Sequence, residues 1–205
     1  MARVILVRHG QTEWNRVERF RGRADVPLNE IGLAQAEATG KRVASEWQPV
    51  CVYSSPLSRA VKTAEAIARH LYLPVQIHAG LADIDYGAWQ GLTPDEVKER
   101  WPEALDAWYR APHTARIPGG ESLDDLRARG LAAVNELAAR HAEQTLVLVG
   151  HTVINRIILL GVLELGNDRF WHLRQDTCAI NVFEMDAQTG ESTLVSLNDT
   201  CHLRE

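Results

Sequence analysis

Two short runs of apolar residues, each followed closely by a histidine, constrain the fold of this chain more than any other feature. One run covers residues 4–7 and ends just before Arg8 and His9, and the other covers 146–149 and ends just before His151. Four consecutive apolar residues fit a strand that is buried on both faces, as in a parallel sheet covered by helices. The runs therefore predict an α/β protein with both histidines at carboxyl strand ends, where open α/β sheets bind ligands.

A long amphipathic helix is expected between the first strand and the next. Residues 30–46 have a helical pattern of apolar positions, and the side chain of Asn29 can cap the first turn. The residues expected to face the core are Ile31, Ala34, Ala38 and Val43.

A further apolar segment, residues 50–54, predicts another strand that leads into a helix of about fifteen residues. Ser55 followed by Pro56 is typical of an N-cap and a first helical residue. Arg59 then lies in the first turn, where free backbone N–H groups already favour anions. Because an arginine adds a charge-assisted donor, this turn is expected to suit a phosphate group.

Residues 80–120 have the pattern of an excursion from the sheet, with a capping box that begins at Thr93 and tryptophans after it. Ser122 is then expected to cap a long helix that leads to the strand at 146–149. These signals predict a single domain over residues 1–205, in which 80–120 forms a helical, lid-like insertion.

The last part of the chain predicts a hairpin of two strands, over 179–183 and 192–197. Strands alternate with helices before that point, which is typical of a parallel sheet with helices on both faces. The predicted fold class is therefore α/β: a three-layer α/β/α sandwich with a mostly parallel sheet and an antiparallel strand near the C-terminus.

Composition limits the partners. The formal net charge is -5 and the pI is about 5.9, so no overall field attracts nucleic acid or an anionic membrane. No apolar run approaches the length of a membrane span, and the three cysteines are widely spaced. We expect a cytoplasmic protein that binds neither nucleic acid nor membrane, and the tryptophan-bearing helices or the last strands could support a homodimer.

Nucleotide-binding and metal-binding motifs are absent from the sequence. There is no glycine-rich phosphate loop of the nucleotide-binding type, and the eight histidines do not lie at close ligand spacing. We therefore expect no metal and no cofactor. Arg8 beside His9 instead suggests an anion site that contains a nucleophile or a base.

Four motifs in order make the chain similar to the histidine phosphatase superfamily, the phosphoglycerate mutase-like group. These motifs are Leu6-Val7-Arg8-His9-Gly10, Glu13-Trp14-Asn15, the segment from Tyr53 through Arg59 to Ala64, and Gly150-His151-Thr152. The resemblance covers essentially the whole chain. It implies a metal-independent phosphatase that acts through a phosphohistidine.

The resemblance also implies a role for each of these positions. His9 corresponds to the nucleophile, and Arg8, Arg59 and His151 correspond to the phosphate pocket around it. The flanking substrate contacts correspond to Asn15, Arg21, Gly22 and Thr152. Asp83 aligns with the family's acid, which is usually a glutamate and which protonates the leaving oxygen; Asp85 is an alternative.

The substrate implied by the resemblance is a small phosphorylated metabolite, and the best match is to metal-independent phosphoserine phosphatases. The match includes the tail around His202, which in that group is implied to reach the substrate's carboxylate. Tyr86 departs from that group, which has a histidine there, but is expected to contact substrate. A phosphoglycerate mutase, a broad-specificity or α-ribazole phosphatase, and a non-catalytic phosphate-binding relative stay open as alternatives.

Overall fold

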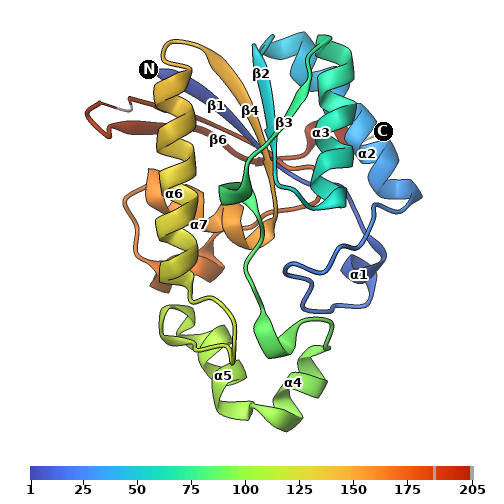
Figure 1. Cartoon of the computed structure of the whole chain (residues 1–205), viewed down its shortest axis with the longest axis vertical. Coiled ribbons are helices and arrows are strands. Elements are labelled where there is room, and N and C mark those ends of the chain that lie inside the picture. The colour runs from blue at the N-terminus through green and yellow to red at the C-terminus, as the bar shows by residue number, and fades with distance from the viewer. Residues whose placement is uncertain (187, 204–205) are drawn as a thin grey trace.

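The computed structural model describes residues 1–186 and 188–203, and its centre is a six-stranded sheet. Helices pack around this sheet (Figure 1). The strand order is β3-β2-β4-β1-β5-β6. The first four of these strands are parallel, whereas β5 is antiparallel to β1 and β6 is antiparallel to β5. The predicted fold class, including the antiparallel hairpin near the C-terminus, is confirmed. The strands are β1 (Ala2–Arg8), β2 (Cys51–Ser54), β3 (Val75–Ile77), β4 (Thr145–Gly150), β5 (Ile180–Met185) and β6 (Ser192–Asp199).

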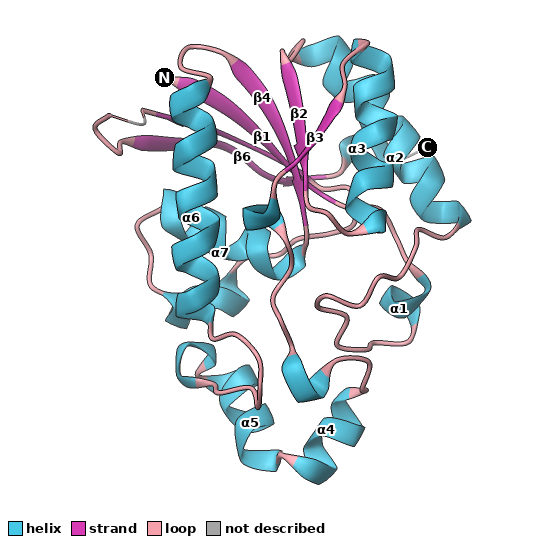
Figure 2. Cartoon of the chain, in the orientation of Figure 1, coloured by secondary structure: helices cyan, strands magenta, loops and turns pink. Residues whose placement is uncertain are grey.

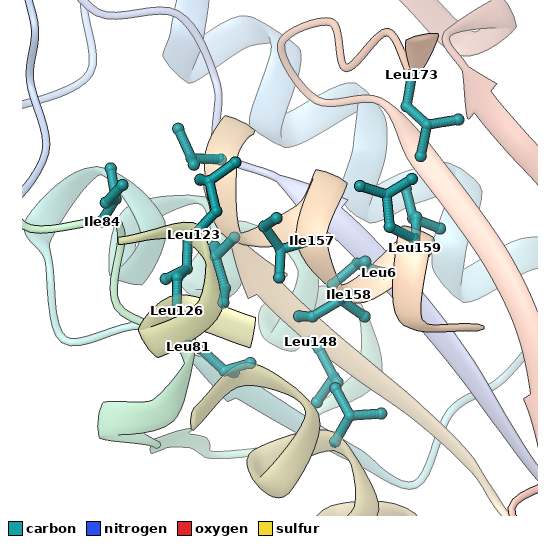
Figure 3. Packing of buried hydrophobic residues seen from close by; sticks show 14 of the residues in the cluster. Leu6, Leu81, Ile84, Leu123, Leu126, Leu148, Ile157, Ile158, Leu159 and Leu173 are labelled. Carbon is teal, nitrogen blue, oxygen red and sulfur yellow. The ribbon is translucent and has the colours of Figure 1, made fainter. Parts of the chain in front are cut away.

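Helices cover both faces of the sheet (Figure 2). In β1, Val4 and Leu6 belong to the apolar cluster that includes α6 and α7, whereas Ile5 and Val7 belong to the cluster that includes α2 and α3. The alternation follows from the two-residue repeat of a strand, and it explains why the run is apolar throughout. Figure 3 shows part of the larger cluster, where Leu6 and Leu148 of the sheet lie near Ile158 of α7. The longer helices are α2 (Glu30–Glu46), α3 (Ser58–Leu71), α6 (Leu123–Arg140) and α7 (Thr152–Val162).

The segment 80–120 leaves the sheet and forms one end of the molecule (Figure 1). It contains α4 (Pro94–Arg100) and α5 (Pro102–Arg110), and Thr93 caps α4 in the predicted capping box. Trp89 and Trp108 are buried and pack edge to face at 6.3 Å, so aromatic contacts hold the segment together. The segment contains two α-helices, and its role as a lid-like insertion in a single domain stays a prediction. The short helix α1 (Glu13–Arg16) lies near this end of the molecule (Figure 1).

The inward face of α2 differs from the expected one. Ile31 and Ala34 are exposed, and the buried residues are mostly small: Gly32, Ala36, Thr39, Gly40 and Val43. The reason is close packing against α3, because a Cβ at Gly40 would lie 2.7 Å from the backbone oxygen of Ala66. Small side chains permit this approach, and the hydrophobicity pattern does not reveal it.

The start of α3 was also predicted wrongly. Its N-cap is Leu57, not Ser55, and the helix begins at Ser58. The Ser55 hydroxyl contacts His151 instead, at 2.7 Å from its Nε2. Arg59 nevertheless lies in the first turn, as expected. In the described part of the chain, no helix has both the length and the apolar character to cross a membrane.

Candidate active site

The register of the two central strands brings the two histidines together. Arg8 of β1 pairs with Gly150 of β4, so the residues that follow, His9 and His151, leave the sheet side by side. The backbone N–H of His9 donates to the Gly150 oxygen at 3.1 Å, and the two imidazole centroids lie 5.1 Å apart. Both side chains are fully buried. The expected placement of both histidines at carboxyl strand ends is confirmed.

The hydrogen bonds of His9 fix its tautomer. Its Nδ1 lies 2.6 Å from the backbone oxygen of Gly10, and a carbonyl oxygen can only accept, so Nδ1 carries the proton. Nε2 therefore bears a lone pair, and within the described residues this buried atom has no hydrogen-bond partner. Burial and the nearby His151 and Arg59 keep the pKa of His9 well below its ordinary value. A neutral imidazole with a free Nε2 is a nucleophile at neutral pH.

Arg59 connects His151 to the loop that follows α1. Its Nε donates to Nδ1 of His151 at 3.2 Å, while Nη1 and Nη2 donate to the backbone oxygens of Ala24 and Gly22, each at 2.7 Å. Because Nδ1 of His151 accepts, its proton is on Nε2 and is donated to Ser55. A phosphoryl oxygen that bound Nε2–H would have to replace the Ser55 hydroxyl as its acceptor.

Three buried or partly buried arginines give this end of the sheet a strong positive charge. Burial and the neighbouring Arg21 lower the pKa of Arg8 to about 9, and burial lowers the pKa of Arg59 to about 10. All three guanidinium groups are still charged at neutral pH. The Nε atoms of Arg8 and Arg21 are buried and have no acceptor among the described residues. Such a cluster of forked donors is suited to a phosphate dianion.

Asp83 provides a carboxyl group beside the arginines. Its Oδ2 lies 3.8 Å from Nη2 of Arg59, and its buried Oδ1 has no hydrogen-bond partner in the described part of the chain. Burial raises the pKa of Asp83, although Arg59 and Arg21 oppose that shift. A carboxyl with a raised pKa can hold the proton that a leaving oxygen needs. The alternative, Asp85, accepts from the N–H of Gly87 and lies outside the cavity described next.

A cavity of about 400 Å³ opens beside these groups. His9, Arg59 and His151 are fully buried next to it. Thr152 begins α7, and its hydroxyl is buried without a partner among the described residues. Asn15 accepts two hydrogen bonds from Thr12 through Oδ1, which leaves its amide N–H groups for a ligand. The predicted site residues that line the cavity are Arg8, Asn15, Arg21, Gly22, Asp83, Tyr86 and Thr152.

His202 is a predicted site residue that does not line the cavity and has its contacts on α2. It lies in the turn η5 (Cys201–Leu203), where Nε2 is 3.0 Å from the Thr39 hydroxyl of α2. Arg42 of α2 holds the tail there through an ion pair with Asp199 at 2.6 Å. The tail therefore packs on α2, and contact of His202 with the substrate stays a prediction.

Two arginines of this region were not identified from the sequence. Arg156 lines the cavity one helical turn after Thr152 on α7. It is the only charged residue of that helix, and its i+4 spacing from Thr152 was a usable signal. Arg129 of α6 binds the backbone that carries Asp83, and no local pattern indicates such a contact.

A neutral histidine lies among arginines at the carboxyl edge of a three-layer α/β/α fold. This arrangement is typical of proteins that transfer a phosphoryl group to a histidine side chain. The chain belongs to the histidine phosphatase superfamily (branch 1), whose family model matches residues 4–200. The resemblance noted from the sequence motifs is confirmed.

Individual relatives are similar over nearly the full length. The chain is 37% identical over 205 residues to phosphoserine phosphatase 1 of Hydrogenobacter thermophilus, which covers 100% of this chain and 96% of that protein. YhfR of Bacillus stearothermophilus superposes with a TM-score of 0.92 and 30% identity, and covers 100% of both chains. A phosphoserine phosphatase variant from Entamoeba histolytica, solved in complex with phosphoserine, gives a TM-score of 0.89 and 26% identity, again over 100% of both chains.

Proposed function

We propose that this protein is a phosphomonoesterase that transfers the phosphoryl group of phosphoserine to His9 and then to water. The observation that carries the proposal is the state of His9: a neutral ring whose Nε2 lone pair has no partner among the described residues. The arginines around it supply the charge that a phosphoryl group in transfer requires. No step needs a metal ion.

In the first step, Arg8, Arg21 and Arg59 bind the phosphoryl oxygens of the ester. Nε2 of His9 forms a bond to phosphorus while the bond from phosphorus to the serine oxygen breaks. Asp83 gives its proton to that oxygen, so serine leaves as the alcohol and His9 holds the phosphoryl group. The raised pKa of Asp83 favours the protonated carboxyl that this step needs.

In the second step, the Asp83 carboxylate accepts a proton from a water molecule that attacks phosphorus. The bond from Nε2 to phosphorus breaks, inorganic phosphate leaves, and both His9 and Asp83 return to their starting protonation states. Tyr86 lines the same cavity, and burial raises the pKa of its hydroxyl, so the hydroxyl stays protonated throughout. Its proposed role is to contact the substrate.

Phosphoserine is the proposed substrate because the relatives over the full length include phosphoserine phosphatases, one of them solved with phosphoserine bound. A broad-specificity phosphatase is the second candidate, because aromatic side chains of Trp14, Tyr109 and Trp171 also line the cavity and could accept larger leaving groups.

The test is steady-state hydrolysis of phosphoserine and p-nitrophenyl phosphate by the purified protein, with His9→Ala as the negative control. We expect a higher kcat/KM for phosphoserine, no turnover by His9→Ala, and an acid-labile phosphoryl group on His9 after rapid quenching. Equal or slower hydrolysis of phosphoserine would reject phosphoserine as the preferred substrate. Turnover by His9→Ala would reject the mechanism, and conversion of 3-phosphoglycerate to 2-phosphoglycerate faster than phosphate release would indicate a mutase.

We also propose a reducing, cytoplasmic setting, since Cys51, Cys178 and Cys201 are all free thiols.

A homodimer stays a prediction, and sedimentation of the purified protein tests it.

A further inference from the structure

Arg156 is a further arginine that lines the cavity, and the phosphoryl mechanism above does not use it. It projects from α7, and its positive charge is one cause of the lowered pKa of Arg8, so the two guanidinium groups lie close enough to repel each other. Arg8, Arg21 and Arg59 already lie around His9, and Arg19 of the cavity lining pairs with Glu96 at 3.4 Å. Arg156 therefore raises the question of which anion it binds.

Aromatic rings hold Arg156 in place. Its Cζ atom lies 5.0 Å from the ring centroids of both Phe170 and Trp171, which belong to the turn η4 (Asn167–His172). The two rings are nearly perpendicular, at 79°, and form a corner for the guanidinium group. Trp171 is itself fixed, because its Nε1 donates to the backbone oxygen of Trp108 at 2.8 Å. Cation–π contact orients a guanidinium group and leaves its N–H donors unused.

Arg156 has no carboxylate partner within the described residues. No acidic oxygen of residues 1–186 or 188–203 lies within 4.0 Å of its nitrogens, and its buried Nε lacks an acceptor. The neighbouring Arg169 is different, because it pairs with Asp168 at 3.1 Å on the surface. A fixed guanidinium with free donors, aimed into a ligand cavity, is suited to a planar anion that it can bind with two hydrogen bonds.

We infer that Arg156 binds the carboxylate of the substrate, while the arginines around His9 bind its phosphoryl group. The inference deepens the proposed phosphatase function and rests on it. It assigns the cavity two anion subsites, so that the preferred substrates are phosphomonoesters that carry a carboxylate a few bonds from the phosphate. Phosphoserine and 3-phosphoglycerate both have this form.

The test compares substrates that differ at the carboxylate. Phosphoserine is paired with O-phosphoethanolamine, which lacks the carboxylate, and 3-phosphoglycerate is paired with glycerol 3-phosphate. The variant is Arg156→Met, whose unbranched side chain can still pack on the two rings. Arg156→Lys keeps the charge without the planar fork. Arg169→Met is the matched control, because Arg169 is an exposed arginine of η4, the segment that supplies the two rings.

We expect the wild-type protein to prefer the carboxylated member of each pair. Arg156→Met should lower kcat/KM for that member by about ten- to a hundredfold, mostly through KM, because one charged hydrogen-bonded contact is lost. It should change kcat/KM for O-phosphoethanolamine and p-nitrophenyl phosphate by less than about twofold. Arg156→Lys should recover part of the loss, and Arg169→Met should behave as wild type.

Two results would overturn the inference. One is an equal loss on all substrates, which would mean that Arg156 supports the fold or the phosphoryl site. The other is an unchanged preference for the carboxylated members. Failure of the proposed function would give different results. If phosphoserine is not the preferred substrate, the 3-phosphoglycerate pair still tests Arg156. If His9→Ala turns over substrate, the phosphohistidine mechanism is rejected, and the assignment of Arg156 is not affected.

Discussion

Arg129 of α6 clamps the backbone that carries Asp83, and this arginine clamp leads to a quantitative prediction. Nη1 of Arg129 donates to the backbone oxygens of Gly80 and Ala82, at 3.1 and 2.8 Å, and Nη2 donates to the backbone oxygen of Asp83 at 2.8 Å. The same guanidinium group binds both carboxylate oxygens of Glu121, at 2.8 and 2.9 Å. Arg129→Met should therefore release the backbone that positions Asp83.

The size of the effect follows from these contacts. A hydrogen bond from a charged donor contributes about 1.5–3 kcal/mol, and the contributions are not additive. Since Arg129 is partly exposed, at 22%, we take about 1.5 kcal/mol for one bond. Because its five bonds are not additive, we expect a total loss of about 2–4 kcal/mol in the free energy of unfolding. The loop itself stays attached through the fully buried Leu81 and Ile84. Asp83 would then be displaced but still present. A general acid contributes a factor of about 10²–10⁴ to the rate, and we expect kcat/KM for phosphoserine to lose part of this factor, about ten- to a hundredfold.

The leaving group distinguishes a positioning effect from general damage. In the proposed mechanism, expulsion of the serine oxygen requires a proton from Asp83, whereas p-nitrophenolate leaves without one. Because kcat/KM reports the steps up to formation of the phosphohistidine, Arg129→Met should lower it strongly for phosphoserine and weakly for p-nitrophenyl phosphate. Arg140→Met is the matched control, since Arg140 lies on the same helix and pairs only with Glu136 at 2.7 Å among the described acids.

Equal losses on the two substrates would refute the assignment of Arg129 as a positioning residue, even if the thermal midpoint fell as expected. Unchanged kinetics on phosphoserine together with a lowered midpoint would refute it as well, because the clamp would then serve stability alone.

Three other perturbations test the site. Asp83→Asn should lower kcat/KM for phosphoserine by about 10²–10⁴-fold. Because burial raises the pKa of Asp83, the ionised carboxyl destabilises the folded state, so Asp83→Asn should raise the thermal midpoint at pH 7. This gain should vanish below about pH 4, where Asp83 is protonated in both the folded and the unfolded state. Gly22→Ala should destabilise the protein by about 2 kcal/mol in urea unfolding, since φ is +47° and the new Cβ would lie 2.7 Å from the Ile84 oxygen. EDTA should leave turnover of phosphoserine unchanged, and inhibition that Mg²⁺ or Zn²⁺ reverses would contradict the metal-independent mechanism.

The parts of the site that could be predicted are those that depend on local sequence. The apolar runs before His9 and His151 determine two buried parallel strands, and neighbouring strand ends must lie together. Arg59 was correctly placed in a first helical turn although its N-cap was not, because the helix tolerates a shift of a few residues at its start.

The parts that the sequence does not show depend on contacts between distant segments. The position of His202 on α2 follows from the pairing of Asp199 with Arg42, which are far apart in the sequence. Arg156 had a local signal in its i+4 spacing from Thr152. Its aromatic corner is supplied by a turn that follows α7, so the sequence alone does not show that the guanidinium is fixed.

The short acid at position 83 shows why the clamp matters for the chemistry. A glutamate, which is usual for this family, can adjust its reach by rotating an extra bond, whereas an aspartate depends more on where its backbone lies. Asp83 is only 4% exposed, and its Oδ2 lies 3.8 Å from Nη2 of Arg59. Arg129 donates to the backbone oxygen of Asp83 itself, so the position of the carboxyl group depends on this contact with the backbone. We therefore expect Asp83 and Arg129 to act as one unit, so that loss of either side chain lowers kcat/KM for phosphoserine more than for p-nitrophenyl phosphate.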